Sequence, residues 1–63
     1  MRLWLKEIRE ENNLTQLKLS EKTGITEQYV YMLETGERRP SVDIAKKIAE
    51  ILGFEWTRFF EGT

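Results

Sequence analysis

The segment from Leu14 to Glu34 constrains the fold most, because it has the pattern of two short helices joined by one tight turn. Thr15 and Thr26 stand where the helices would begin, and a threonine hydroxyl at an N-cap accepts a hydrogen bond from an otherwise unpaired backbone N–H. Gly24 lies between them, where the chain must enter the left-handed backbone region that glycine adopts without strain. The segment predicts helices over residues 16–23 and 27–35.

Apolar residues flank both predicted caps in the spacing of a hydrophobic staple. Leu14 precedes the first cap and Leu19 follows it by four residues, and Ile25 and Val30 repeat this arrangement around the second. Two capped helices so close together form a helix-turn-helix unit. We expect its helices to be held together by Leu17, Ile25, Val30 and Leu33.

Three further helices complete the predicted fold, which is an all-α five-helix bundle forming one domain over residues 1–63. The first covers residues 2–12, with Leu5 and Ile8 facing the core and a left-handed end at Asn12-Asn13. Another is capped by Ser41 and ended by Gly53. Its apolar positions repeat every three and four residues, at Val42, Ile44, Ala45, Ile48, Ala49, Ile51 and Leu52. A short fifth helix covers residues 56–60.

This pattern resembles the helix-turn-helix family of phage repressors, Cro proteins and their Xre-like relatives. The residues that match are Thr15, Gln16, Leu19, Ser20, Gly24, Ile25, Thr26, Val30, Leu33, Glu34 and Gly36, followed by Pro40, Leu52 and Gly53. Ser20 stands where the family mostly has alanine, and it is small enough to allow the helices to approach closely. The resemblance covers roughly residues 5–60. It implies a lambda-repressor-like fold that binds double-stranded DNA, with the second helix of the unit in the major groove.

The outward face of the helix at residues 27–35 is the expected reading surface for base edges. Gln28 can form two hydrogen bonds with adenine, and Glu27 can accept one from cytosine. Tyr31 or Met32 can contact a thymine methyl group. The alternative is an ordinary solvent-exposed helix face.

Contacts to the DNA backbone are expected from residues around that face, which are Gln16, Thr26, Tyr29, Thr35, Arg38, Arg39 and Ser41. In the family, the glutamine at the position of Gln16 contacts a phosphate and steadies a side chain of the recognition helix. Arginine suits phosphate because its planar donors match the oxygens. Tyr29 could instead pack against the preceding helix, and Arg38 and Arg39 could form a solvated charged loop.

Two other groups of residues have expected structural roles. The resemblance implies a partly buried ion pair between Arg9 and Glu34, and the alternative is two exposed charges. Four aromatic residues near the C-terminus exceed what a small monomer easily buries, so some should close the core over Trp4 and the rest should form a homodimer interface. These four are Phe54, Trp56, Phe59 and Phe60.

The charge balance tempers the DNA hypothesis. Ten basic and eleven acidic residues give a net charge of −1, whereas DNA affinity comes largely from lysine and arginine contacts with phosphates. We expect weak non-specific binding with a steep salt dependence. The acidic balance and the aromatic C-terminus also favour an alternative function, a protein-interaction module of the antitoxin or adaptor type.

The absence of His and Cys removes the usual ligands of zinc and the usual catalytic nucleophile and base. We therefore expect no enzymatic activity, no cofactor, no metal and no small-molecule substrate.

No apolar run approaches the length of a membrane span. The family resemblance implies a cytoplasmic protein of a bacterium, phage or mobile element, and the start at Met1 favours a complete small protein over part of a larger one. The predicted function is transcriptional repression by a dimer on a near-palindromic operator, with activation or an excision accessory role as a weaker alternative.

Overall fold

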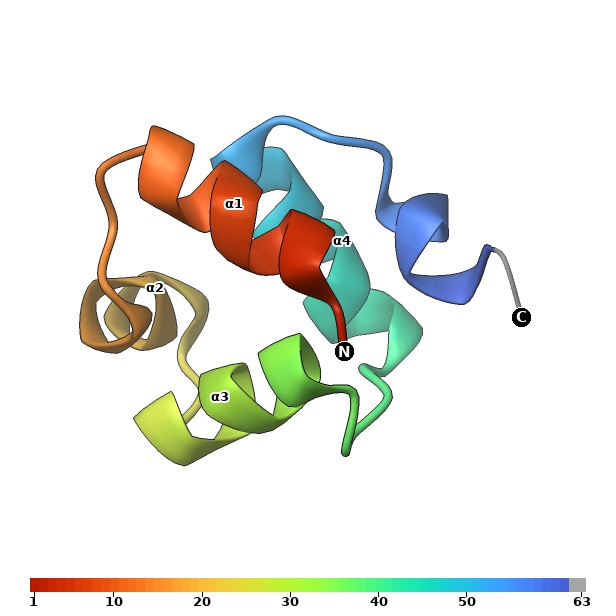
Figure 1. The fold of residues 1–63 in the computed structure, drawn as a ribbon, viewed down its shortest axis with the longest axis horizontal. Coiled ribbons are helices and arrows are strands. Elements are labelled where there is room, and N and C mark those ends of the chain that lie inside the picture. The colour runs from red at the N-terminus through yellow and green to blue at the C-terminus, as the bar shows by residue number, and fades with distance from the viewer. Residues whose placement is uncertain (62–63) are drawn as a thin grey trace.

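The computed structural model describes residues 1–61, and over that range the chain folds into four α-helices and one 3-10 helix without any strand (Figure 1). The elements are α1 (Leu3–Glu11), α2 (Gln16–Thr23), α3 (Glu27–Thr35), α4 (Val42–Leu52) and the 3-10 helix η1 (Trp56–Phe60). The predicted all-α class is confirmed. The predicted count of five helices is not matched exactly, because the short fifth segment takes the tighter 3-10 form that is common in short pieces of helix.

The helix boundaries follow the capping residues. The hydroxyl oxygens of Thr15, Thr26 and Ser41 accept hydrogen bonds from backbone N–H groups three residues further on, at 3.0, 3.0 and 3.2 Å. Gly24 ends α2 with a φ of +75°, and Asn13 has a φ of +59° after α1. Side-chain hydrogen bonding at the caps and left-handed residues at the ends thus fix α2, α3 and α4 at the predicted residues.

The core combines one to three side chains from each helix. Its buried members are Leu5, Leu19, Val30, Leu33, Ala45, Ile48, Leu52 and Phe59. The α2 helix packs against α3 and α4, and α1 packs against α3. Every buried side-chain nitrogen and oxygen in residues 1–61 has a hydrogen-bond partner.

Leu17 does not belong to this core, and its predicted role between the two helices is wrong. Its side chain is 51% exposed, whereas the buried side of α2 is formed by Leu19, Ser20 and Thr23. Residues two positions apart on an α-helix lie about 200° apart around its axis, so burial of Leu19 turns Leu17 outward. Val42, in the first turn of α4, is also exposed.

The C-terminal aromatics close one side of the core over α1. The Trp4 ring makes edge contacts with Phe54 and Phe59, with ring centroids 5.2 and 5.3 Å apart. Phe59 is only 4% exposed, so it is a core residue and cannot contribute surface to the expected dimer interface. Phe54, Trp56 and Phe60 remain half-buried.

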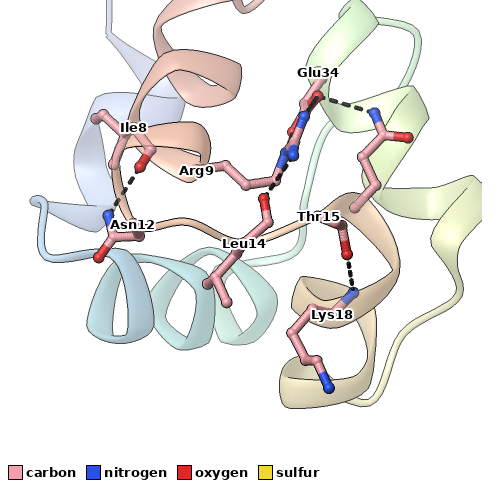
Figure 2. Close-up of polar contacts among 8 residues, drawn as sticks. Ile8, Arg9, Asn12, Leu14, Thr15, Lys18 and Glu34 are labelled. Atoms are coloured by element: carbon pink, nitrogen blue, oxygen red, sulfur yellow. Dashed lines mark hydrogen bonds and ion pairs between the residues drawn. The ribbon is translucent and has the colours of Figure 1, made fainter.

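A buried ion pair joins α1 to α3. Arg9 Nε donates to Glu34 Oε2 at 2.6 Å, Arg9 Nη2 donates to Oε1 at 3.3 Å, and the two side chains are 8% and 5% exposed. Figure 2 shows the Arg9 guanidinium between the Glu34 carboxylate and the Leu14 carbonyl, to which Nη1 donates at 2.7 Å. The Arg9 side chain therefore fixes α1 to α3 and also to the loop that leads into α2.

No helix within residues 1–61 is long and apolar enough to cross a membrane. The same part of the chain contains no cluster of three or more His, Cys, Asp or Glu side chains that could hold a metal ion.

We predict that Arg9→Ala lowers the free energy of unfolding by about 3–5 kcal/mol, because the Glu34 charge would stay buried without its partner. Urea denaturation followed by circular dichroism measures this loss. Lys18→Ala is the matched control, since it breaks the 3.5 Å pair with Glu21, whose members are 59% and 57% exposed, and should cost less than about 1 kcal/mol. Equal losses in the two variants would contradict a stabilising role for the buried pair.

Candidate nucleic-acid interface

The outward face of α3 is set by which of its residues the core takes. Val30, Leu33 and Glu34 are buried, and the Thr26 cap and the turn at Gly24 fix where the helix begins. Glu27 and Gln28 are exposed as a result, and Tyr31 is 48% exposed. The first turn and a half of α3 thus presents a carboxylate, an amide and a phenol to solvent.

These three residues share an open cleft with the first residue of α2. Gln16, Glu27, Gln28 and Tyr31 line a hollow of about 310 Å³ between the N-terminal ends of α2 and α3. Side chains from two helices therefore converge on one open, shallow surface. Met32 does not line this cleft and is half-buried, so it is less available for a base contact than the other three predicted residues.

A second, smaller cleft continues the surface toward the N-terminus of the chain. It has a volume of about 90 Å³ and is lined by Met1, Arg2, Leu3, Lys6, Gln16, Tyr31, Glu34 and Thr35. Gln16 and Tyr31 border both clefts. The start of α1, including the positive charge of Lys6, thus adjoins the outward face of α3.

The Gln16 side chain is held in place by an intramolecular hydrogen bond. Its Nε2 donates to Glu34 Oε1 at 3.0 Å. The Glu34 carboxylate therefore accepts a hydrogen bond from Gln16 as well as the two from Arg9. A glutamine at the first position of α2 is thereby tied to α3, and its amide has a defined place in the cleft.

Hydroxyl groups around the surface already have intramolecular roles. Thr26 and Ser41 accept the capping bonds of α3 and α4, which leaves each hydroxyl proton available for another acceptor. Thr35 Oγ1 lies 3.1 Å from both the Met32 carbonyl and Glu37 Oε1. The Thr35 hydroxyl proton is therefore taken up within the protein, which makes it a weaker candidate for a phosphate contact.

The two arginines of the loop between α3 and α4 rest on aromatic rings. The Arg38 guanidinium lies 5.5 Å from the centre of the Tyr29 ring, and that of Arg39 lies 5.6 Å from the centre of the Phe60 ring. Both arginines are exposed and Tyr29 is half-buried. Stacking on a ring restricts the long side chain while the guanidinium keeps its hydrogen-bond donors.

Arg2 is a functional candidate that sequence reasoning missed. Its Nη1 donates to the Leu33 carbonyl at 2.8 Å and to the Arg38 carbonyl at 2.9 Å. Burial, and to a lesser degree the positive charge of Arg39, lower the pKa of its guanidinium below the ordinary value. Both partners are more than 30 residues away in the chain, and a lone arginine before a helix gives no indication of them.

Comparison with known proteins gives a consistent result. A family model described as helix-turn-helix matches residues 5–59. The uncharacterized HTH-type transcriptional regulator YqaF of Bacillus subtilis (strain 168) is 49% identical over 61 residues, which are 97% of this chain and 80% of the relative. An uncharacterized HTH-type transcriptional regulator of Methanothermobacter thermautotrophicus is 44% identical over 55 residues, covering 87% of this chain and 80% of the relative.

A further relative extends the comparison to another archaeon. It is an uncharacterized HTH-type transcriptional regulator of Archaeoglobus fulgidus, 37% identical over 51 residues that cover 81% of this chain and 72% of the relative. No solved structure matches the chain. The matched residues include all four α-helices except the first two residues of α1.

We predict that Gln16→Glu lowers the free energy of unfolding at pH 7 by about 1.5–3 kcal/mol, since a hydrogen bond to a charged group is replaced by repulsion between carboxylates. Urea titrations at pH 7 measure this loss. Gln28→Glu, on the exposed face of α3, should change stability little, and a similar loss there would show that the effect of Gln16 is not specific.

Proposed function

The chain belongs to the helix-turn-helix family of Xre- and Cro-like proteins, and on that premise we propose that it binds double-stranded DNA at specific sequences and represses transcription as a homodimer. Its relatives carry the name of transcriptional regulators. The observation that supports the proposal best is the convergence of Gln16, Glu27, Gln28 and Tyr31 on one open surface at the head of α3. None of these four side chains belongs to the core.

The chemistry of this surface suits base edges in the major groove. The Gln28 amide offers a donor and an acceptor to adenine, the Glu27 carboxylate accepts from the amino group of cytosine, and the Tyr31 ring offers apolar contact to a thymine methyl group. Met32, being half-buried, is the least accessible member of the proposed base-reading set.

Contacts to the DNA backbone would surround these residues. Gln16 begins α2, where backbone N–H groups without helical partners attract phosphate. Arg38 and Arg39 supply positive charge on the loop after α3, and the Thr26 and Ser41 hydroxyls have protons to donate. Because the whole chain carries a net charge of −1, these few cations would have to provide the counterion release on which affinity depends.

Repression would follow from occlusion of a promoter by two copies of the chain, acting in the cytoplasm. Phe54, Trp56 and Phe60 remain half-buried beside the core, and pairing of these aromatics between two copies would cover them. Such a dimer would present two α3 helices to successive major grooves roughly 34 Å apart.

The test of this function is selection of bound duplexes from a random DNA library at low salt. We expect enrichment of a near-palindrome whose half-sites are about ten base pairs apart, since that is the spacing of successive major grooves. Sedimentation of the selected complex should give two chains per duplex. Recovery of sequences no different from the input would overturn sequence-specific binding and would favour a protein-interaction module built on the same fold.

We predict that Gln28→Ala weakens binding to the selected duplex by about 1–3 kcal/mol and relaxes the preference at one base pair of each half-site. Fluorescence anisotropy with a panel of single-substitution duplexes measures both quantities. Glu50→Ala, at an exposed position of α4, should leave the ranking of the panel unchanged. A base preference that Gln28→Ala does not alter would exclude Gln28 from base contact.

A further inference from the structure

Arg2 connects three separate parts of the molecule. Its backbone N–H donates to the Glu34 carbonyl at 2.7 Å, and its guanidinium lies 5.7 Å from the centre of the buried Phe59 ring. Through Nη1 it also holds the Leu33 and Arg38 carbonyls. Figure 1 shows the N-terminus beside the end of α3 and the loop that follows it. The residue thus bridges the end of α3, the following loop and η1.

The Leu33 and Arg38 carbonyls lie on either side of the turn that follows α3, the proposed recognition helix. Leu33 lies in the last turn of α3, and Arg38 lies beyond the left-handed residue Gly36. Because one nitrogen binds both carbonyls, it fixes the separation of the helix end and the loop. The backbone of Arg38 then has one defined position relative to α3, and its side chain is placed over Tyr29.

The hydrogen bonds of Arg2 bring positive charges close together, and the repulsion between these charges opposes folding. Arg2 lies close enough to Arg39 that, after burial, the charge of Arg39 helps to lower the pKa of Arg2. In a chain with a net charge of −1, the neighbouring guanidinium groups of Arg2 and Arg39 produce a local positive potential, to which the Arg38 charge over Tyr29 adds. An anion such as a phosphate would relieve this repulsion.

We propose that Arg2 is a positioning residue for the DNA-backbone contacts of Arg38 and Arg39. This inference rests on the proposed function. In this role Arg2 holds the loop at the distance from α3 that lets the arginines reach phosphates while Gln28 and its neighbours reach bases. Its guanidinium is engaged with carbonyls of the protein, so its contribution to binding passes through the loop.

The first experiment compares the salt dependence of DNA binding by the unchanged chain and by Arg2→Ala, using the selected duplex at a temperature where circular dichroism shows both to be folded. Each phosphate contact contributes about 0.9 to the slope of log K against log salt, so loss of one loop contact should reduce the slope by about that amount. Affinity at physiological salt should fall roughly tenfold. Loss of packing alone would lower the melting temperature and leave the slope unchanged, and that outcome would overturn the proposal.

Lys47→Ala is the matched control for charge. It removes one positive charge from an exposed position of α4 and should leave the slope within the error of the unchanged chain. An equal reduction by Lys47→Ala would show that the Arg2 effect reflects net charge, and it would overturn the positioning role.

A second experiment separates positioning from direct contact. In the Arg38→Ala/Arg39→Ala background the loop has no arginine left to position, so adding Arg2→Ala should weaken binding less than twofold, far below its effect in the unchanged chain. A full, additive effect would mean that Arg2 contacts DNA itself. If Arg2→Ala does not fold, Arg2→Met keeps an unbranched side chain to pack near Phe59 but removes the donor to both carbonyls, and a reduced slope is expected from it. An unchanged slope in folded Arg2→Met would then overturn the proposal.

These outcomes keep the two proposals distinguishable. If the unchanged chain does not bind DNA at low salt, the proposed function is wrong and the role of Arg2 falls with it. If the unchanged chain binds and Arg2→Ala binds with the same salt slope, only the positioning role is wrong.

Discussion

The buried contact between Arg9 and Glu34 is the interaction on which the arrangement of the site depends. The Glu34 carboxylate lies near the end of α3 and receives both Arg9 nitrogens and the amide of Gln16. Arg9 also binds the Leu14 carbonyl at the entrance to α2. One network of hydrogen bonds to charged groups therefore sets the positions of α1, α3 and the start of α2. Such charge-assisted hydrogen bonds are stronger than neutral ones.

That network explains how a small core can hold a recognition surface. Eight buried apolar residues form the core, and apolar packing by itself tolerates small shifts and rotations of helices. Directional hydrogen bonds do not, since their strength falls steeply with angle. Gln16 takes part in the network and also lines the outward cleft, so the same contacts that orient α3 place a polar group at the proposed DNA surface.

The charges of the molecule are unevenly distributed around α3. Arg2 and Arg39 lie near each other beyond the C-terminal end of α3, whereas Glu27 lies at its N-terminal end, where the helix dipole favours a carboxylate. A net charge near zero therefore conceals an uneven distribution of charge around α3. Aromatic rings of Tyr29, Phe59 and Phe60 lie beneath the three guanidinium groups, which gives positions to side chains that would otherwise be mobile.

The sequence by itself determined what depends on local chemistry. Caps at Thr15, Thr26 and Ser41 and the left-handed Gly24 fixed the bounds of α2, α3 and α4, because their hydrogen bonds span only three or four residues. The exposed residues of α3 followed from the burial of Val30 and Leu33. Only the tertiary structure decided the burial of Leu17 and Phe59, since Leu17 turned outward and Phe59 inward according to how neighbouring elements pack. It also decided the role of Arg2, because hydrogen bonds to carbonyls 31 and 36 residues away depend on chain segments whose proximity no local pattern encodes.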